Sequence, residues 1–149
     1  IGFSDPGSPE PLARHAMACP ALPLCGLAMT EAERFLPELL ERIKKQLKSL
    51  EINKSILIRV TGCPNGCARP YMAELALVGS GLNQYQLWLG GTPNLQELAK
   101  PYIQKMPLND LEKTIEPLLI NWKESGGKLS LGEHVIKIGD QAVNQLLNN

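Results

Sequence analysis

Apolar residues recur at helical spacing between positions 35 and 49, and charged residues occupy most of the positions between them. The apolar set is Phe35, Leu36, Leu39, Leu40, Ile43 and Leu47. This period predicts an amphipathic helix over residues 35–49. Pro37 fits such a helix only in its first turn, where its missing N–H removes no hydrogen bond. Thr30 and Glu33 have the spacing of a capping box, and we expect a separate turn before the helix.

A second helical pattern follows in the C-terminal third of the chain, with apolar residues at positions 108, 111, 115, 118, 119 and 122. Asn109 is a plausible N-cap for this helix, and the Gly-Gly pair at 126–127 provides a stop. Pro117 predicts a kink or a break inside it. Farther along, the pattern predicts two short helices, over residues 131–138 and 141–147.

Three shorter segments have the character of strands. The run SILIRVTG at residues 55–62 is rich in β-branched residues and ends in glycine. Residues 73–79 and 84–90 are joined by a short turn, so we expect them to pair as a hairpin. Residues 15–28 contain two prolines and predict an irregular buried loop, and residues 1–14 predict an extended arm. The expected fold is α/β (α+β): a small mixed or antiparallel sheet flanked by helices, with cysteine-bearing loops.

The composition argues against several classes of function. Lys and Arg together number 15, as do Asp and Glu, so no global charge points to nucleic acid or to an anionic membrane. No apolar run reaches the length of about 18 residues that a membrane-spanning helix needs. The opening stretch IGFSDPGSPEP lacks the charged-then-apolar pattern of a secretion signal. The expected compartment is therefore reducing, where cysteines serve as ligands more often than as disulfides.

The four cysteines form two pairs on two predicted loops. Cys19 and Cys25 are separated by PALPL, and Cys63 and Cys67 are separated by PNG. Zinc sites usually place about two to four residues between neighbouring ligands, so the first gap is wide for zinc. Iron–sulfur clusters also take four thiolates and tolerate uneven spacing. The spacing therefore favours a cluster, with zinc, a disulfide and unligated structural cysteines as the alternatives.

Glycine and proline surround both pairs of cysteines. Gly26, Gly62 and Gly66 free the backbone to approach a cluster closely. Backbone N–H groups aimed at cluster sulfurs would tune the reduction potential. The prolines stiffen the loops, so less conformational entropy is lost when the site assembles.

Three stretches carry a resemblance to a known family: MACPALPLCGLAMTEAERFLPELL, RVTGCPNGCARPYMAELALVG and YQLWLGGTPN. They resemble the C-terminal part of the ferredoxin-dependent sulfite reductases, within the wider family of sulfite and nitrite reductases. The similarity runs at least from Arg14 to Trp122. The [4Fe–4S] cluster ligands that the resemblance implies are Cys19, Cys25, Cys63 and Cys67. It further implies that Cys67 is the catalytic thiolate that bridges the cluster to the iron of a sirohaem.

The activity that this resemblance implies is the reduction of sulfite to sulfide, with ferredoxin as the donor of single electrons. A thiolate shared between cluster and sirohaem would give a through-bond electron path and an axial ligand together. The opposite face of the haem would then remain open for substrate. Enzymes of this family are several times longer, and their substrate-binding cations lie in an N-terminal region. We therefore expect an N-terminal remainder of the reductase as a partner and no turnover by this chain alone.

Asn65, Gly66 and Arg69 are the residues that we expect to contact the cofactors. The groups of Asn65 and Gly66 lie between the last two cysteines, and Arg69 can pair with a sirohaem carboxylate. The alternatives are a simple turn residue at Asn65 and a surface or interdomain ion pair at Arg69. The motifs CPNGCARPYMAEL and CPALPLC favour sulfite, with a nitrite reductase part as the alternative.

The resemblance also suggests how the chain is divided. We expect an arm or linker at 1–14, the cluster- and sirohaem-binding domain at 15–128 and a C-terminal tail at 129–149. Without the other part of the enzyme, the apolar loops around Cys19 and Cys25 should be exposed. The competing hypothesis is a folded, non-catalytic domain without cofactor or with adventitious zinc. The implied location is a cyanobacterial cytoplasm or a plastid stroma, with no membrane or nucleic-acid partner.

A few conspicuous side chains are expected to be structural. Trp88 and Trp122 should anchor the core. His134 should lie on the surface, and Arg14 and His15 should have packing or surface roles. None of these residues enters the expected site.

Overall fold

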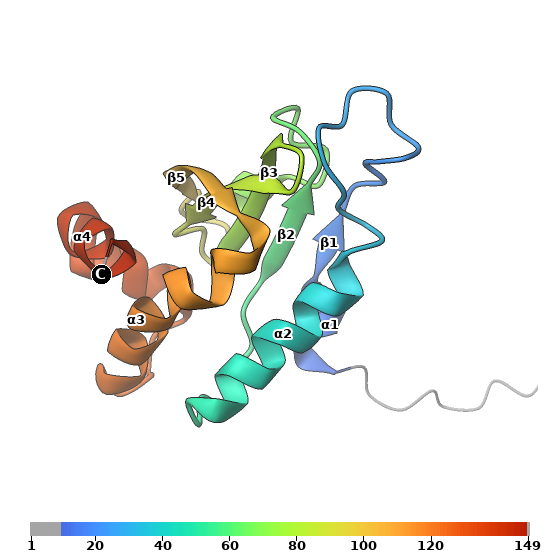
Figure 1. The fold of residues 1–149 in the computed structure, drawn as a ribbon. Helices are drawn as coiled ribbons and strands as arrows, with labels where there is room; N and C mark the ends of the chain where they lie inside the picture. The colour runs from blue at the N-terminus through green and yellow to red at the C-terminus, as the bar shows by residue number, and fades with distance from the viewer. Residues whose placement is uncertain (1–9, 149) are drawn as a thin grey trace, which may run out of the picture.

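The computed structural model describes residues 10–148, which form a mixed sheet of five strands with helices packed on it (Figure 1). The helices are α1 (Pro11–His15), α2 (Leu36–Ser49), α3 (Leu111–Glu124) and α4 (Leu131–Leu147), with short 3-10 turns η1 (Pro70–Met72) and η2 (Leu108–Asp110). The strands are β1 (Met17–Ala18), β2 (Ile58–Thr61), β3 (Leu75–Gly81), β4 (Gln84–Leu89) and β5 (Lys100–Pro107). They lie side by side in chain order. β1, β2 and β3 are parallel, whereas β3, β4 and β5 are antiparallel, which confirms the expected fold class.

The core lies between the sheet and the helices. Leu39 and Ile43 of α2 are fully buried with Ile58 and Val60 of β2. In Figure 1, α2 and α3 lie across the same side of the sheet, and α4 packs on α3. Apolar residues at helical spacing therefore cover a sheet whose own apolar residues alternate along the strands.

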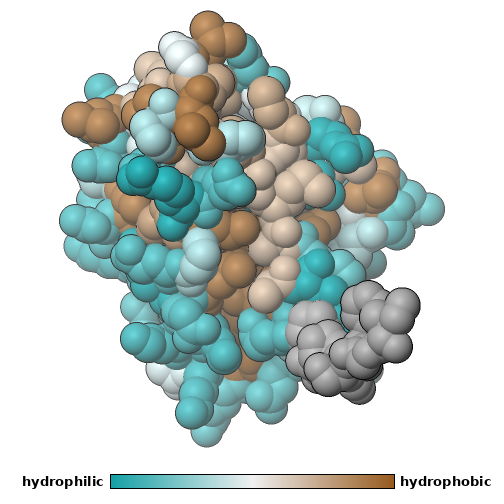
Figure 2. All heavy atoms as spheres, turned by 90° about the vertical axis from the view of Figure 1, so that its right-hand side faces the viewer, coloured by the Kyte–Doolittle hydropathy of each residue, from teal (hydrophilic) through white to brown (hydrophobic). Residues whose placement is uncertain are grey.

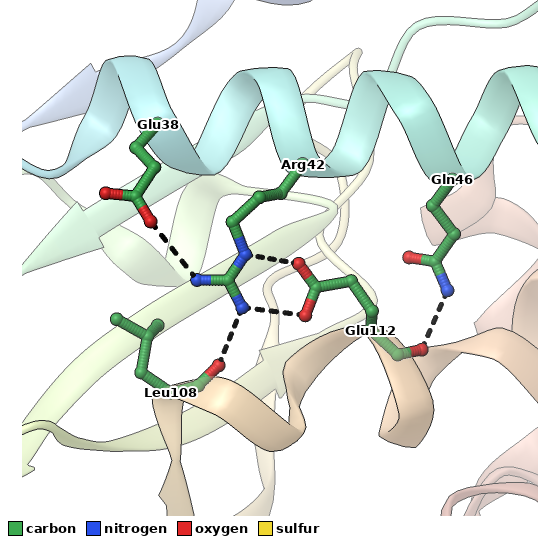
Figure 3. A network of polar contacts seen from close by, with 5 residues as sticks. All are labelled: Glu38, Arg42, Gln46, Leu108 and Glu112. Atoms are coloured by element: carbon green, nitrogen blue, oxygen red, sulfur yellow. Dashed lines mark hydrogen bonds and ion pairs between the residues drawn. The ribbon is translucent and has the colours of Figure 1, made fainter.

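A polar network ties α2 to α3 at the edge of this core (Figure 3). Arg42 of α2 donates through Nε and Nη2 to both carboxylate oxygens of Glu112, and its Nη2 also reaches the Leu108 carbonyl at 3.1 Å. One turn farther along α2, Gln46 Nε2 donates to the Glu112 carbonyl at 2.7 Å. A two-pronged Arg–carboxylate pair is geometrically specific, so this network sets how the two helices lie on each other.

Glu74 joins the sheet to the C-terminal helix. Its side chain is buried, its Oε2 accepts from the Leu57 N–H at 2.8 Å and its Oε1 accepts from the Gly132 N–H at 3.1 Å. Gly132 belongs to the first turn of α4, where backbone N–H groups lack partners within the helix. The carboxylate thus satisfies this end of the helix and holds it against the start of β3.

Most of the expected elements are confirmed. α2 occupies the predicted 35–49 region with Pro37 in its first turn, and the hairpin of β3 and β4 is present. α3 passes through Pro117 as one helix, so the predicted break is not found. Gly139, at φ 79°, divides α4 into the two helical stretches that the pattern predicted.

Several local expectations are wrong. Residues 1–14 were expected to be extended, but a short helix covers Pro11–His15, and residues 1–9 lie outside the described residues. Thr30 does not cap a helix, because its hydroxyl donates to Tyr85 Oη and accepts from the Asn83 N–H. The capping box is instead formed by Ser130 at the start of α4. Asn109 lies inside η2, and the N-cap of α3 is Asp110.

The expectations for two large side chains are also wrong. His134 is buried, with 2% exposure, because α4 turns it against α3. Trp88 is only half-buried, since it lies on the β4 face opposite to Leu87 and Leu89; Trp122 does lie in the core. Strand β5 was not expected from the sequence. It contains two prolines and is mostly exposed, as is common for strands at the edge of a sheet.

Candidate cluster-binding site

The two cysteine loops leave the sheet at the same edge. β1 and β2 are parallel, with Met17 opposite Arg59 and Ala18 opposite Val60. Cys19 directly follows β1, and its N–H donates to the Val60 carbonyl at 3.1 Å. Cys63 comes two residues after the end of β2. Parallel strands end at one edge of a sheet, so both loops start side by side there.

Gly62 joins these two loops. Its carbonyl accepts hydrogen bonds from the N–H groups of Met29 at 2.8 Å and Thr30 at 3.3 Å. Its own N–H donates to Cys19 Sγ at 3.3 Å. A Cβ added at Gly62 would lie 2.5 Å from the Cβ of Ala21. The loop formed by residues 19–30, here called the first cysteine loop, is therefore packed directly on the backbone at Gly62.

Residues 62–74, here called the crossover, carry the second pair of cysteines. The crossover returns from the end of β2 to the start of the parallel strand β3, and η1 within it packs on both strands. The Gly66 N–H donates to the Cys63 carbonyl at 3.4 Å, and the Arg69 N–H donates to the Gly66 carbonyl at 2.7 Å. Gly66 has φ 67°, a left-handed conformation that glycine adopts without strain. Consecutive tight turns thus shape the chain around Cys67.

The four thiols differ in exposure. Cys63 is buried, Cys19 and Cys25 are half-buried, and Cys67 is exposed; all four are free. Within residues 10–148, no group of three or more His, Cys, Asp or Glu side chains is close enough to hold a metal ion. The structure therefore brings together the two loops that carry the thiols, whereas the four sulfurs themselves do not form a ligand cage.

Asn65 and Arg69 lie at the surface of the crossover. Both residues are exposed, and Arg69 has φ 52°, which is uncommon for a residue with a side chain. No hydrogen bond or ion pair of either side chain is formed within the described part of the chain. Their roles as cofactor contacts stay predictions.

The sequence did not lead us to expect a role for Arg59, a residue of β2 that contacts the crossover. Its Nη1 donates to the Ala68 carbonyl at 3.1 Å, directly after Cys67 in the chain. The signal was present as the one charged residue within the apolar run SILIRVTG.

Apolar side chains are exposed around the first cysteine loop. Leu24 is 78% exposed and Leu27 is 70% exposed, and Met29 is also exposed. Figure 2 faces the side of the molecule that carries this loop and shows hydrophobic residues gathered at its upper end. The expectation of a buried loop over residues 15–28 is thus wrong at Leu24 and Leu27. The expectation of exposed apolar loops is confirmed.

The residues present fit a thiolate-held cluster in three respects. Four free cysteines lie on two loops that start at one sheet edge. A backbone N–H already points to one of the sulfurs, as is usual where a protein tunes a cluster. Glycine at the junction allows the close backbone approach that such a site needs. These features are typical of domains that hold a metal centre through cysteine thiolates.

The chain belongs to the family described as the nitrite and sulphite reductase 4Fe-4S domain, whose model matches residues 11–139. It is 50% identical over 139 residues to the sulfite reductase [ferredoxin] of Synechococcus elongatus, covering 91% of this chain and 22% of that protein. It is 47% identical over 118 residues to a sulfite reductase [NADPH] hemoprotein beta-component of Xylella fastidiosa, covering 78% of this chain and 21% of that protein. The chain thus spans about a fifth of the length of these curated relatives.

Two solved structures share the fold. The NirA protein of Mycobacterium tuberculosis has a TM-score of 0.74 at 22% identity, over 91% of this chain and 27% of that one. Dissimilatory sulfite reductase I has a TM-score of 0.69 at 11% identity, over 91% of this chain and 52% of that one. At these identities the likeness supports the fold alone.

The family assignment confirms the resemblance found in the sequence. It supports a domain of an oxidoreductase, with a [4Fe–4S] cluster and a sirohaem as the cofactors of the family. Among the described residues, no helix is long and apolar enough to cross a membrane.

Proposed function

We propose that this chain is the C-terminal, cluster- and sirohaem-binding part of an assimilatory sulfite reductase that uses ferredoxin as its electron donor. The observation that carries the proposal is the pairing of the two cysteine loops at one sheet edge, joined through Gly62. The 50% identity to a sulfite reductase [ferredoxin] supports ferredoxin as the donor, and both curated relatives support sulfite over nitrite as the substrate. Substrate and donor would be engaged together with an N-terminal remainder of the enzyme.

In this proposal the four thiolates of Cys19, Cys25, Cys63 and Cys67 would hold the cluster, and Cys67 would also bind the sirohaem. The cofactors supply the storage and transfer of electrons for the reduction of sulfite to sulfide. The protein holds Cys63 in the buried part of the site and presents Cys67 at the surface, where a second cofactor has access. The Gly62 N–H donates to Cys19 Sγ, and this hydrogen bond would stabilise the negative charge of the thiolate.

The residues around Cys67 complete the proposed site. Asn65 and Gly66 form the turn that precedes this thiol, and Gly66, with its left-handed backbone, directly precedes the exposed Cys67. Arg69 has an exposed guanidinium that can pair with a carboxylate of the sirohaem. Each of these roles concerns binding and orientation, and the chemistry of the redox steps belongs to the cofactors.

The test is the metal content of the whole chain, purified and reconstituted without oxygen. About four irons and four sulfides per chain are expected, with little zinc. Cys63→Ser and Cys67→Ser should each lower the iron content sharply. Met29→Leu, which removes an exposed sulfur from the first cysteine loop, should leave it unchanged. Zinc in place of iron, or iron uptake unaffected by the cysteine substitutions, would contradict the proposal.

A further inference from the structure

Arg59 occupies an unusual place in the sheet. Its neighbours along β2, Ile58 and Val60, are fully buried in the core under the helices. Strand side chains alternate between faces, so the Arg59 side chain extends from the other face of the sheet. That is the face on which the crossover lies, since Arg59 is hydrogen-bonded to it.

The guanidinium of Arg59 contacts the surroundings of both cysteine loops. Its Nη1 donates to the Ala68 carbonyl at 3.1 Å and lies 3.8 Å from Met17 Sδ. Ala68 directly follows Cys67, and Met17 precedes Cys19 by two residues. One side chain thus touches the segments from which two of the four thiols extend.

The crossover is anchored at its two ends by hydrogen bonds such as that from the Ala99 N–H to the Tyr71 carbonyl at 2.7 Å. Among the described residues, the bond from Arg59 is the one hydrogen bond that joins positions 64–70 to a residue outside the crossover. The crossover returns between two parallel strands without a long helix, and only η1 gives it regular structure. Ala68 and Pro70 are buried on the sheet, whereas Cys67, just before them, is exposed. Where the thiol of Cys67 lies is therefore set largely by how Ala68 is held.

Ion pairing does not explain why an arginine is present. Within residues 10–148 no carboxylate forms a salt bridge with Arg59, and its Nε is buried without a hydrogen-bond partner. Burial, and next the positive charge of Arg69, lower the pKa of Arg59. The fold thus keeps the positive charge of Arg59 in a partly buried position without a carboxylate partner. The hydrogen bond to the Ala68 carbonyl is the favourable contact that Arg59 gains there.

We propose that Arg59 is a positioning residue: by holding the Ala68 carbonyl, it sets the place of the Cys67 thiol relative to the other three cysteines. The part of this inference that concerns cluster binding rests on the proposed function. The anchoring of the crossover itself does not, because it is a property of the metal-free chain.

Amide hydrogen exchange of the metal-free whole chain tests the anchoring. The variants are Arg59→Met, which keeps an apolar stem, and Arg59→Lys, which keeps a positively charged hydrogen-bond donor. Arg34→Met is the control, since Arg34 forms an exposed pair with Glu31 away from the crossover. In Arg59→Met we expect about fivefold faster exchange at the amides of Arg69 and Met72, with partial recovery in Arg59→Lys. Unchanged exchange, or equal acceleration throughout β2 and β3, would overturn the proposal.

The reconstituted chain tests the consequence for the cluster. We expect the electron paramagnetic resonance spectrum of the reduced cluster to change in Arg59→Met, and chelators to remove its iron faster. Arg59→Lys should return both properties toward the wild type, and Arg34→Met should match the wild type. An identical spectrum and equal iron loss in Arg59→Met would overturn the positioning role. A wild-type chain that takes up no iron would contradict the proposed function, and the exchange result would still decide the anchoring.

Discussion

At the scale of single residues, glycine decides whether the two cysteine loops can lie together. Gly62 is packed between the first cysteine loop and β3, and a Cβ on it would lie 2.5 Å from Ala21 Cβ and 2.8 Å from the Thr30 carbonyl oxygen. Gly79 of β3 is equally tight against the backbone of Gly62. Two backbones can approach this closely only where neither carries a side chain. The sequence motif TGC therefore has a packing reason as well as a chemical one.

Gly62→Ala should destabilise the chain, because the added methyl group overlaps the first cysteine loop. We expect the free energy of unfolding to fall by about 2 kcal/mol in urea denaturation. Gly26→Ala is the matched control, since a Cβ at Gly26 meets nothing within 4 Å. Equal effects of the two substitutions would mean that the loops do not pack as described.

At the scale of elements, the C-terminal helices depend on a buried histidine. His134 of α4 lies 2.9 Å, through Nε2, from Asn121 Oδ1 of α3, and its Nδ1 is buried without a partner in the described chain. Next to it, the Trp122 indole N–H donates to the Leu129 carbonyl at 3.0 Å. The neutral imidazole fits this interface, whereas a charged one would need a second acceptor.

The packing of α3 and α4 should therefore weaken in acid. Burial, and next the positive charge of Lys137, lower the pKa of His134. The unfolded chain then binds a proton more readily than the folded chain, so stability is lost as the pH falls below about 6.5, the usual histidine value. The test is urea denaturation at pH values from about 7.5 down to about 5, the range in which histidine titrates. The free energy of unfolding should fall less over this range in His134→Gln than in the wild type.

The exposed His15 provides the control for this pH dependence. His15→Gln should leave the slope of stability against pH as it is in the wild type. If His134→Gln and the wild type lose stability equally between these pH values, the buried imidazole is not the group that responds.

At the scale of the whole molecule, the chain has a well-packed core, but part of its surface is apolar and exposed. The helices cover one side of the sheet, whereas the first cysteine loop exposes large apolar side chains such as Leu24 and Leu27 (Figures 1 and 2). Exposed apolar groups gathered near a functional site are typical of surfaces that another protein part covers. This agrees with a chain that spans about a fifth of its curated relatives.

Replacing both Leu24 and Leu27 by serine should affect association and leave the fold intact. The two side chains contribute little to the core, so the free energy of unfolding should change by less than about 0.5 kcal/mol. Binding to the N-terminal part of the reductase that we propose as partner, measured by calorimetry, should weaken about tenfold. Ile120→Ser, which alters an exposed residue of α3, should leave binding unchanged. Unaltered binding in the double variant would exclude this surface from the interface.

Local patterns in the sequence were sufficient for the elements that depend on neighbours in the chain. α2 and α3 follow from apolar residues at helical spacing, and the hairpin of β3 and β4 follows from two apolar runs with a short turn. The division of α4 at Gly139 also follows from its local sequence. The cysteine motifs likewise pointed to the family that the comparison supports. Helix period and turn chemistry are properties of a few consecutive residues, so they can be read without the fold.

Tertiary structure decided what depends on distant residues. Strand β5 forms because β4 offers it an edge, despite its prolines, and Thr30 turns to Tyr85 rather than to a helix end. His134 is buried because α3 lies against it, and Arg59 gains its partner only where the crossover passes over β2. The sequence by itself determined α2, α3, the two stretches of α4, the hairpin and the cysteine-bearing loops. Which loops lie together, and which polar groups hold them, was decided by pairing between parallel strands, because residues far apart in the chain meet only when the sheet forms.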